Sequence, residues 1–319
     1  MFTIEKIKEA QKRIAPYVYK TPLLRLNNLE EYLGCQVYTK MESLQKTNSF
    51  KVRGAVNKLM TLSEEELNKG IITVSSGNHG KAVAYAATLQ GKTARVVIPD
   101  NAPKIKVEGI RSYGAEIIYS TVSERYNAAR QLSEENGWTL IPPFDDYEII
   151  AGQGTAGLEI LEQLPDADYI VAPIGGGGLI GGISTAVKEI NPKVKVIGVE
   201  PAVVPRYSAS FEAGYPVSLD PNSKSVADAL QTLRPGERNY PIIEKYVDKI
   251  VTVEEGNILK ATKFLLTKGK LLAEISSCIT IGAVLQKAIE FKPEDKVVFL
   301  ISSGNIGMDQ FNKFEEISL

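Results

Sequence analysis

The chain has 319 residues, of which 44% are hydrophobic and 24% charged, and its formal net charge is −1. This length suggests two lobes, because single domains usually hold ~100–150 residues. The balanced charge gives no reason to expect a nucleic-acid partner, and no apolar run reaches the ~18 residues that a membrane-spanning helix needs. The N-terminal segment is charged throughout and resembles neither a signal peptide nor an anchor, so we expect a cytoplasmic protein.

The sequence offers few ligands for a metal ion. It contains one histidine, His79, and two cysteines, Cys35 and Cys278. These residues have neither the number nor the spacing of a zinc site, and the cysteines lack the pattern of a disulfide framework. We therefore predict no metal and interpret both cysteines as small buried hydrophobic residues.

Apolar segments that suit strands alternate with amphipathic segments that suit helices along the whole chain. The first part predicts a helix from Ile4 to Pro16, a strand over 37–41, a helix that starts after Asn48 or Ser49 and a helix that starts after Ser63. Next come predicted strands at 72–75, 94–99, 116–120 and 139–142, with helices at 81–89, 104–114 and 123–137 between them. The rest predicts a helix at 151–164, a strand at 168–174, a helix at 179–190, a strand at 194–200, an irregular stretch over 201–240, a strand at 249–253, two helices and a strand at 297–302.

This order of elements predicts the α/β fold class, in which open, mostly parallel, twisted sheets are flanked by helices. We expect two such domains. Residues 52–147 would form a small, mobile domain, and residues 1–51 would rejoin residues 148–319 to form a large domain.

Three predicted strands end in loops rich in glycine and small polar residues: SSGNHGK at 75–81, PIGGGGLIGG at 173–182 and SSGNIG at 302–307. In open parallel sheets, ligands bind outside the carboxyl ends of the strands. We therefore expect these three loops to converge on one site.

Four consecutive glycines, Gly175–Gly178, make the second loop the most informative. Without Cβ atoms, successive backbone N–H groups can face one point, and the helix that follows adds the positive end of its dipole. Such an arrangement suits a phosphate group. The loop lacks the Gly-Lys-Ser/Thr of a Walker motif and fits the dinucleotide fingerprint only in part. A tight turn that binds no ligand stays open as the alternative.

The loop at 75–81 places two hydroxyls, an amide and the imidazole of His79 at a helix N-terminus. Such a set suits a small carboxylate, although a simple helix cap would use the same residues. The hydroxyls of Ser302 and Ser303 and the amide of Asn305 leave the same two interpretations open.

Lys51 follows Ser49 and Phe50 in the stretch KTNSFKVRGA. A lysine in a partly desolvated site has a lowered pKa and can form a Schiff base with an aldehyde. Taken alone, Lys51 would be an ordinary solvated lysine at a helix start. Together with a phosphate cradle at Gly175–Gly178 and an aromatic ring at Phe50, it suggests a site for pyridoxal 5′-phosphate.

At this point the sequence resembles a known family. The stretches that match, in order and spacing, are KTNSFKVRGAVNKL (46–59), SSGNHGKAVAYAA (75–87), AGQGTAGLEIL (151–161), PIGGGGLIGGI (173–183), VIGVEP (196–201) and FLISSGNIG (299–307). They are similar to those of the fold-type II pyridoxal-phosphate enzymes, and among these to the threonine/serine dehydratases and serine racemases. The resemblance covers nearly the whole chain and is to the short form without a regulatory domain. It implies a two-domain architecture like that of the tryptophan synthase β subunit, and a homodimer.

The resemblance also implies a role for each residue singled out above. Lys51 would hold the cofactor through a Schiff base, Phe50 would pack on the cofactor ring and Ser302 would face the pyridine nitrogen. The remaining cofactor contacts would come from Asn78 to the phenolic oxygen and, to the phosphate, from the backbone amides of Gly175, Gly176, Gly177, Gly178 and Leu179. The amino-acid substrate would be bound by Asn48, Ser75, Ser76, Asn78 and His79.

The implied reaction is an ammonia-lyase (dehydratase) reaction that converts L-threonine or L-serine into 2-oxobutanoate or pyruvate plus ammonia. Lys51 would remove the Cα proton, and the β-hydroxyl would then leave with a proton from the cofactor phosphate. A hydroxyl partner such as Ser302, unlike a carboxylate, would leave the ring nitrogen largely neutral. This weaker electron sink favours prompt loss of the hydroxyl over a long-lived carbanion.

Several positions depart from the family pattern. Asn48 stands where the family usually has glycine, and Lys81 stands where glutamine is common. Ser76 occupies the place of the second, catalytic acid–base residue of serine racemases. The stretch EISSCITIG keeps the family's glutamate, Glu274, but differs after it. Asn48 would therefore affect which β-substituent fits, and Ser76 keeps a racemase open.

A divalent-cation site of the family is not expected here. The family uses the glutamate of Val-Glu-Pro for such an ion, and this residue is Glu200. Arg206 follows it where an acidic ligand would be needed, and a cation at this place argues against a bound divalent ion. Arg206 would either pair with Glu200 or lie on the surface.

Other functions stay open at this stage. A serine racemase or a lyase for another β-substituted amino acid is the nearest alternative, followed by a β-replacing synthase such as cysteine or threonine synthase. A non-catalytic phosphate- or nucleotide-binding module is an alternative from another class, but it leaves Lys51 unexplained.

Overall fold

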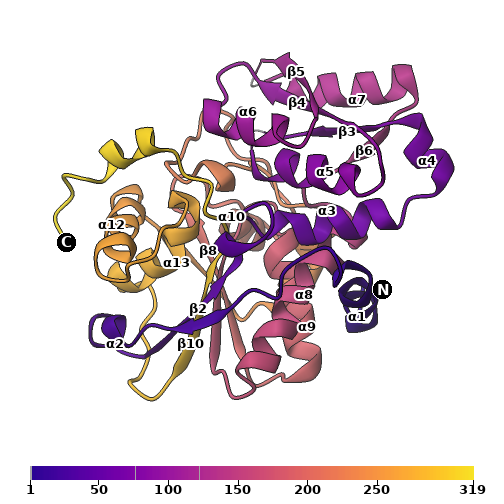
Figure 1. The fold of residues 1–319 in the computed structure, drawn as a ribbon. Helices are drawn as coiled ribbons and strands as arrows, with labels where there is room; N and C mark the ends of the chain where they lie inside the picture. Colours follow the sequence, from indigo (N-terminus) through magenta and orange to yellow (C-terminus); the bar gives the residue numbers. More distant parts are fainter. Residues whose placement is uncertain (1, 76, 122) are drawn as a thin grey trace.

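The computed structural model describes residues 2–75, 77–121 and 123–319. Within these ranges, ten strands form two sheets, which occupy separate parts of the molecule (Figure 1). The larger sheet has the order β1-β2-β10-β7-β8-β9, and its strands are β1 (Leu23–Arg25), β2 (Gln36–Met41), β7 (Tyr169–Pro173), β8 (Lys195–Pro201), β9 (Lys249–Val253) and β10 (Lys296–Ile301). The smaller sheet has the order β5-β4-β3-β6, and its strands are β3 (Ile71–Val74), β4 (Ala94–Pro99), β5 (Glu116–Ser120) and β6 (Thr139–Ile141).

All neighbouring strands are parallel except for the antiparallel pair β1–β2. The predicted α/β class with mostly parallel sheets is therefore confirmed. Strand β2 pairs with β10, which places residues 36–41 beside residues 296–301 in the larger sheet.

Helices cover both sheets. They are α1 (Ile4–Ile14), α2 (Asn27–Leu33), α3 (Lys51–Met60), α4 (Glu64–Lys69), α5 (Asn78–Thr88), α6 (Lys104–Arg111), α7 (Arg125–Asn136), α8 (Tyr147–Gln163), α9 (Gly178–Ile190), α10 (Arg206–Ala213), α11 (Asn239–Tyr246), α12 (Glu255–Thr267) and α13 (Ile275–Leu285). Three short 3-10 helices are η1 (Glu42–Leu44), η2 (Asp228–Leu230) and η3 (Met308–Lys313).

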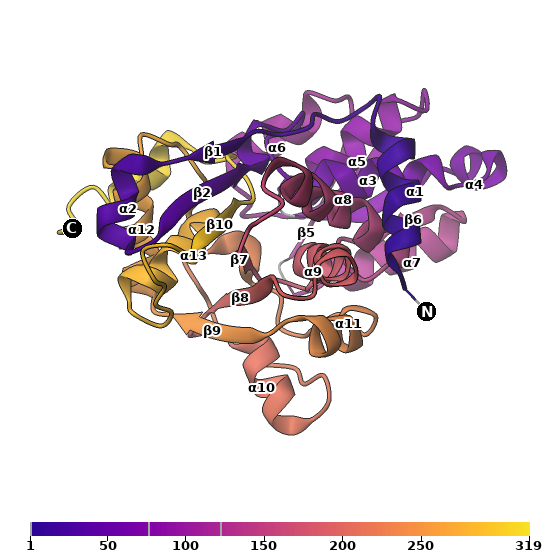
Figure 2. The same ribbon diagram turned by 90° about the horizontal axis from the view of Figure 1, so that it is seen from below.

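Strand β10 lies inside the larger sheet and shows how the core is built. Phe299 and Ile301 pack with residues of α12 and α13 on one face, and Val298 and Leu300 pack with residues of α8 and α9 on the other. This alternation follows from the two-residue period of a strand. Figure 2 shows the two helix pairs on opposite sides of the sheet. A parallel sheet buried on both faces explains why its strands have continuous apolar sequences.

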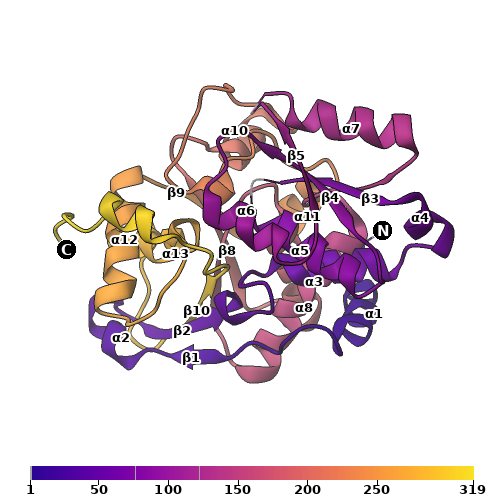
Figure 3. The same cartoon turned by 45° about the horizontal axis from the view of Figure 1, so that its top comes forward.

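The smaller sheet is covered in the same way. Its strands pack against α3, α5 and α6 on one side and against α7 on the other. Figure 3 brings this sheet and its helices forward. All four strands fall within residues 52–147, the predicted small domain. The boundaries and the mobility of this domain remain predictions.

The observed elements differ from the expected ones in three places. The stretch 201–240 is not wholly irregular, because it contains α10 and η2. Pro205 precedes α10 and Gly214 ends it with φ 79°, so the many prolines and glycines of this stretch mark the ends of a short helix. Strand β1 and helix α2 were not predicted. Helix α3 forms where it was predicted, but its N-cap is Phe50 rather than Asn48 or Ser49, and Ser49 forms a bridge to Ser303.

Candidate active site

The backbone before Lys51 is fixed against the end of β10. The N–H of Phe50 donates to the carbonyl of Ser302 (3.0 Å), and the N–H of Gly304 donates to the carbonyl of Asn48 (2.9 Å). Asn48 has φ 57°, in the left-handed region that glycine and asparagine tolerate best. These contacts place the first residue of α3 beside the loop that follows β10.

The amine of Lys51 is held in a poorly solvated place. Its Nζ donates to the carbonyl of Pro143 (2.6 Å) and lies 5.2 Å from the centre of the Phe50 ring. Burial lowers the pKa of Lys51 to about 8, because desolvation disfavours the charged form. Among the ion pairs of the described residues, none includes Lys51. The amine of Lys51 is therefore deprotonated more readily than that of a solvated lysine, which is a property that a nucleophile or a base needs.

The glycine loop follows β7 and leads into α9. A Cβ at Gly176 would lie 2.3 Å from the ring of Phe144, and a Cβ at Gly177, which has φ 104°, would lie 2.1 Å from the hydroxyl of Tyr207. The hydroxyl of Tyr207 donates to the carbonyl of Gly176 (2.9 Å), whereas no hydrogen bond between described residues uses the N–H groups of residues 175–177. Positions 176 and 177 therefore have no room for a Cβ, and the amides of residues 175–177 have no hydrogen-bond partner among the described residues.

The loops after β3 and β10 meet through their asparagines. Asn305 donates to the side-chain oxygen of Asn78 (2.7 Å), and Asn78 donates to the carboxylate of Glu274 (2.8 Å). Lys81 donates to the amide oxygens of Asn305 (3.0 Å) and Asn48 (3.2 Å). The structure thus brings together two of the three loops that the sequence predicts to converge.

The predicted cofactor residue Ser302 belongs to a cluster of buried hydroxyls. Its Oγ lies 2.9 Å from the Oγ of Ser277, which also lies 3.2 Å from the Oγ of Ser303. The Oγ of Ser303 donates to Glu274 (2.5 Å). Sequence reasoning missed Ser277, although it lies in EISSCITIG, the stretch that departs from the family pattern.

The remaining predicted substrate residues lie in different surroundings. The Oγ of Ser75 accepts a hydrogen bond from the N–H of Gly77 (3.1 Å), and Ser76 lies outside the described residues. His79 is buried, and its Nε2 lies 3.3 Å from the carbonyl of Ile141. Burial and the nearby charge of Lys51 lower the pKa of His79 to about 3, so the imidazole is neutral. Its role at a substrate carboxylate remains a prediction.

A cavity of about 380 Å³ opens beside the asparagines. Asn48, Asn78 and Lys81 line it together with Lys106 of α6, whereas Lys51 and the glycine loop are not among its lining residues. The buried amine of Lys106 donates to the carboxylates of Asp228 (2.5 Å) and Glu274 (2.9 Å). Sequence reasoning missed this ion pair, which joins α6 of the smaller sheet to the larger sheet's side of the site.

The structure decides between the two alternatives for Arg206. Its side chain is fully buried, so a surface arginine was wrong, and its Nη1 lies 3.9 Å from a carboxylate oxygen of Glu200. The guanidinium also donates to the carbonyls of Ile174 and Gly175, at the start of the glycine loop. Arg206 and Glu200 are thus within ion-pair distance, but the hydrogen bonds to the Glu200 carboxylate come from backbone N–H groups in the first turn of α10. Among the described residues, no three His, Cys, Asp or Glu side chains are grouped as metal ligands would be.

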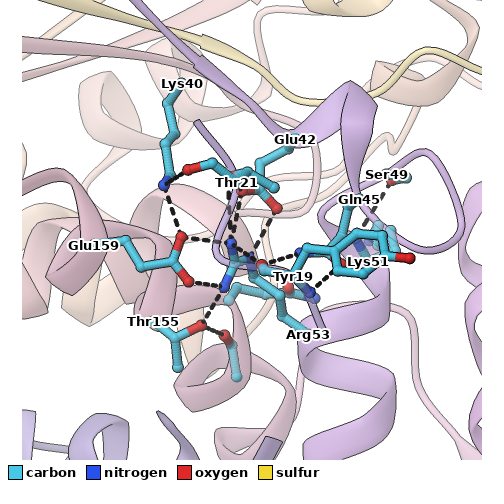
Figure 4. A network of polar contacts seen from close by, with 12 residues as sticks. Tyr19, Thr21, Lys40, Glu42, Gln45, Ser49, Lys51, Arg53, Thr155 and Glu159 are labelled. Atoms are coloured by element: carbon cyan, nitrogen blue, oxygen red, sulfur yellow. Dashed lines mark hydrogen bonds and ion pairs between the residues drawn. The ribbon is translucent and has the colours of Figure 1, made fainter. Parts of the chain in front are cut away.

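A network of buried charges lies behind Lys51 (Figure 4). Arg53, two residues further along α3, contacts both oxygens of Glu42 (2.8 Å each) and both oxygens of Glu159 (2.7 and 2.9 Å). Lys40 also donates to Glu159 (2.6 Å), so two cations balance two carboxylates. Helix α3 crosses α8 closely here, since a Cβ at Gly152 would lie 2.5 Å from the carbonyl of Arg53. The network therefore fixes the helix that carries Lys51.

None of the helices within the described ranges combines the length and the apolar character that crossing a membrane requires.

Comparisons with known proteins agree with this arrangement. Residues 14–303 match the family described as "Pyridoxal-phosphate dependent enzyme". The chain is 42% identical to an L-threonine ammonia-lyase of Thermotoga maritima over 98% of this chain and 78% of that protein. It superimposes on the threonine deaminase of T.th. with a TM-score of 0.90 and 41% identity, covering 96% of this chain and 99% of the other. For maize serine racemase the TM-score is 0.92 and the identity 36%, covering 98% and 96%. The chain therefore belongs to the family of pyridoxal-phosphate dependent enzymes.

Proposed function

We propose that the protein is a pyridoxal-phosphate-dependent ammonia-lyase that converts L-threonine or L-serine into the 2-oxo acid and ammonia. The observation that carries this proposal is the position of Lys51. Its amine, with a pKa of about 8, lies on a helix tied to the end of β10, where the hydroxyl of Ser302 is buried. The similarity to an L-threonine ammonia-lyase and to a threonine deaminase supports the reaction.

The residues present fit this cofactor. The phosphate would bind to the amides of Gly175–Gly178 and Leu179. A Cβ at Gly176 or Gly177 finds no room there, and the N–H groups of residues 175–177 have no partner among the described residues. Lys51 would hold the aldehyde, and Phe50 would lie against the ring. Bound pyridoxal phosphate withdraws electrons from the bonds at the substrate Cα.

The protein's own groups would carry the proton transfers. The amine of Lys51, once released by the substrate amine, would remove the Cα proton, which a pKa near 8 permits at neutral pH. Ser302 would face the ring nitrogen with a neutral hydroxyl that Ser277 orients (2.9 Å), an arrangement that favours loss of the β-hydroxyl. Asn78 would contact the phenolic oxygen while Glu274 fixes its amide. Asn48 would lie close to the β-substituent.

Serine racemisation is the second candidate activity, and the similarity to maize serine racemase favours it. It would use Ser76 as the acid–base residue on the face opposite Lys51. We also propose that the protein is a cytoplasmic homodimer, because the resemblance to the family implies one. Size-exclusion chromatography with light scattering measures the dimer directly, and a monomer would refute it.

The reaction can be tested on the purified holoenzyme with L-threonine, L-serine and D-serine offered separately. We expect oxo acid and ammonia from an L-amino acid, and D-serine from L-serine only if the racemase activity is present. Lys51→Ala should abolish activity and the lysine-bound cofactor absorbance that borohydride removes from the wild type. Lys58→Ala is the matched control, because Lys58 lies on the same helix and pairs with Asp146. An active Lys51→Ala variant would refute the proposal.

A further inference from the structure

The first turn of α10 holds three consecutive peptide groups of the glycine loop. Arg206, the first residue of this helix, donates from its guanidinium to the carbonyls of Ile174 (2.5 Å) and Gly175 (3.1 Å). The hydroxyl of Tyr207, the next residue, donates to the carbonyl of Gly176 (2.9 Å). Both side chains are fully buried. Two adjacent side chains therefore anchor three successive carbonyls.

These anchors determine where the amides of the loop point. No described peptide bond is cis, and in a trans peptide the carbonyl of one residue and the N–H of the next point in opposite directions. Because the carbonyls of residues 174–176 are directed at α10, the N–H groups of residues 175–177 are directed away from it. These are the same N–H groups that have no hydrogen-bond partner among the described residues. The loop therefore presents three donors on the side opposite to the anchors.

The charge of Arg206 also strengthens these donors. A hydrogen bond from a charged group polarises the peptide that accepts it, so the N–H at the other end of that peptide becomes a better donor. The guanidinium donates to a third carbonyl, that of Leu230 (2.5 Å), whereas the carboxylate of Glu200 lies 3.9 Å away, too far for a hydrogen bond. Glu200 accepts instead from the N–H groups of Tyr207 (3.0 Å) and Ser208 (2.8 Å). Glu200 thus fixes the helical turn that carries both anchors, and the guanidinium acts on peptide carbonyls.

The glycine loop also lies next to the segment that holds Lys51. A Cβ at Gly176 would lie 2.3 Å from the ring of Phe144. Phe144 follows Pro143, whose carbonyl accepts the hydrogen bond from Nζ of Lys51. The loop is therefore close to the amine that is proposed to hold the cofactor aldehyde.

We infer that Arg206 and Tyr207 are positioning residues that aim the amides of residues 175–177 at the phosphate of the cofactor. This inference rests on the proposed function and adds to it two residues that act through the backbone of the loop. A phosphate group binds more tightly to donors that are already oriented, because orienting them on binding costs conformational free energy. Removing an anchor should therefore weaken binding of the phosphate group in particular.

The test compares pyridoxal phosphate with pyridoxal, which lacks the phosphate, on the full-length protein. Both compounds can react with Lys51, so the lysine-bound absorbance measured during a titration reports the affinity for each. For Arg206→Met, we expect the affinity for pyridoxal phosphate to fall by about 10- to 100-fold, the range for losing a charge-assisted hydrogen bond, while the affinity for pyridoxal stays close to that of the wild type. Arg206→Lys, which keeps the charge, should restore part of the loss. Arg234→Met is the control, because Arg234 is exposed and pairs with Glu237.

Tyr207→Phe is the second variant, and it decides on the proposal if Arg206→Met does not fold. It keeps the ring and removes only the hydroxyl that holds the carbonyl of Gly176. We expect the affinity for pyridoxal phosphate to fall by about 3- to 10-fold, the range for a neutral hydrogen bond, again with little effect on pyridoxal. An unchanged affinity for pyridoxal phosphate in the folded variants, or a loss that is equal for the two compounds, overturns the proposal.

A failure of the proposed function gives a different result. If neither compound produces the lysine-bound absorbance with the wild type, the assignment of Lys51 is wrong. Inorganic phosphate then tests the loop by itself, since a ligand that binds the folded state raises the melting temperature. This rise should be larger for the wild type than for Arg206→Met or Tyr207→Phe. An equal rise in all three proteins, or none in the wild type, overturns the positioning role.

Discussion

Removing the charge of Arg53 should destabilise the fold in a way that depends on pH. Arg53 is fully buried and contacts two buried carboxylates, Glu42 and Glu159. The change Arg53→Met keeps a long apolar side chain and removes the guanidinium. Glu159 then retains Lys40 (2.6 Å), but Glu42 retains only the hydroxyl of Thr21 (2.6 Å) as a hydrogen-bond donor among the described side chains. A buried carboxylate is thus left without an adjacent cation.

The unpaired carboxylate of Glu42 determines how much free energy of unfolding the variant loses. Breaking a buried ion pair by removing one partner costs about 3–5 kcal/mol, because the remaining charge is desolvated without compensation. Globular proteins unfold with an entropy of about 2.1 cal/mol/K per residue, so this loss lowers the melting temperature of a 319-residue chain by about 4–7 °C.

The pKa of Glu42 determines how the stability of Arg53→Met changes with pH. In the native protein, burial raises the pKa of Glu42, but the charge and hydrogen bonds of Arg53, together with the charge of Lys40 and the hydroxyl of Thr21, outweigh burial and lower it. Its ionised form therefore stabilises the fold above its unfolded pKa. Without Arg53, burial dominates and the folded pKa rises above the unfolded value. The loss of stability caused by Arg53→Met should then be largest at pH 8. It should become smaller as the pH falls, because Glu42 takes up a proton.

Circular dichroism melts at pH 8 and pH 5.5 measure this effect. Adding Glu42→Gln to Arg53→Met should recover part of the lost stability at pH 8, because the unpaired charge is gone. Arg25→Met is the matched control, since Arg25 forms a similar pair with Glu30 (2.8 Å) at the surface, where solvent screens the charges, and its melting temperature should change little. A deficit that is absent at pH 8, or that grows towards pH 5.5, would refute the reasoning.

Three further predictions concern the candidate site. Because burial lowers the pKa of Lys51 to about 8, cofactor-free protein should recapture pyridoxal phosphate faster at pH 9 than at pH 7, and a rate that does not vary would contradict this assignment. Gly176→Ala should weaken cofactor retention on gel filtration, since relieving the overlap costs about 1–3 kcal/mol, while the exposed Gly256→Ala should retain it. Lys106→Met should lower the melting temperature by leaving two carboxylates without their cation, and exposed Lys104→Met on the same helix should not.

The sequence predicts most regular elements because each strand and helix has its own period. The strands at 94–99 and 116–120 have the predicted bounds, since apolar residues and turn signals coincide there. The sequence pattern does not predict helix α10, because this helix is short and the segments that flank it are rich in proline and glycine. Local pattern thus suffices where an element is long or flanked by clear signals.

Some residues of the candidate site can also be predicted from the sequence, whereas their distant contacts cannot. Gly175–Gly178 stand out in the sequence as four consecutive glycines, and Lys51 gains its meaning from them and from Phe50. At Gly176 and Gly177 the structure leaves no room for a Cβ. Partners such as Ser277 for Ser302, or Arg53 for Glu159, depend on segments far apart in the chain. No periodicity encodes which distant side chains meet, so these contacts become visible only in three dimensions.

The pairing of β2 with β10 has a consequence for synthesis on the ribosome. The smaller sheet is continuous between Ile71 and Ile141, so all its strands can assemble while the second half of the chain is still being translated. Strand β2 emerges before that sheet, yet its parallel neighbour β10 is made after all the other described strands. During elongation the nascent chain therefore carries a strand edge that lacks its parallel partner, and such an edge is a place where a chaperone can prevent wrong pairing.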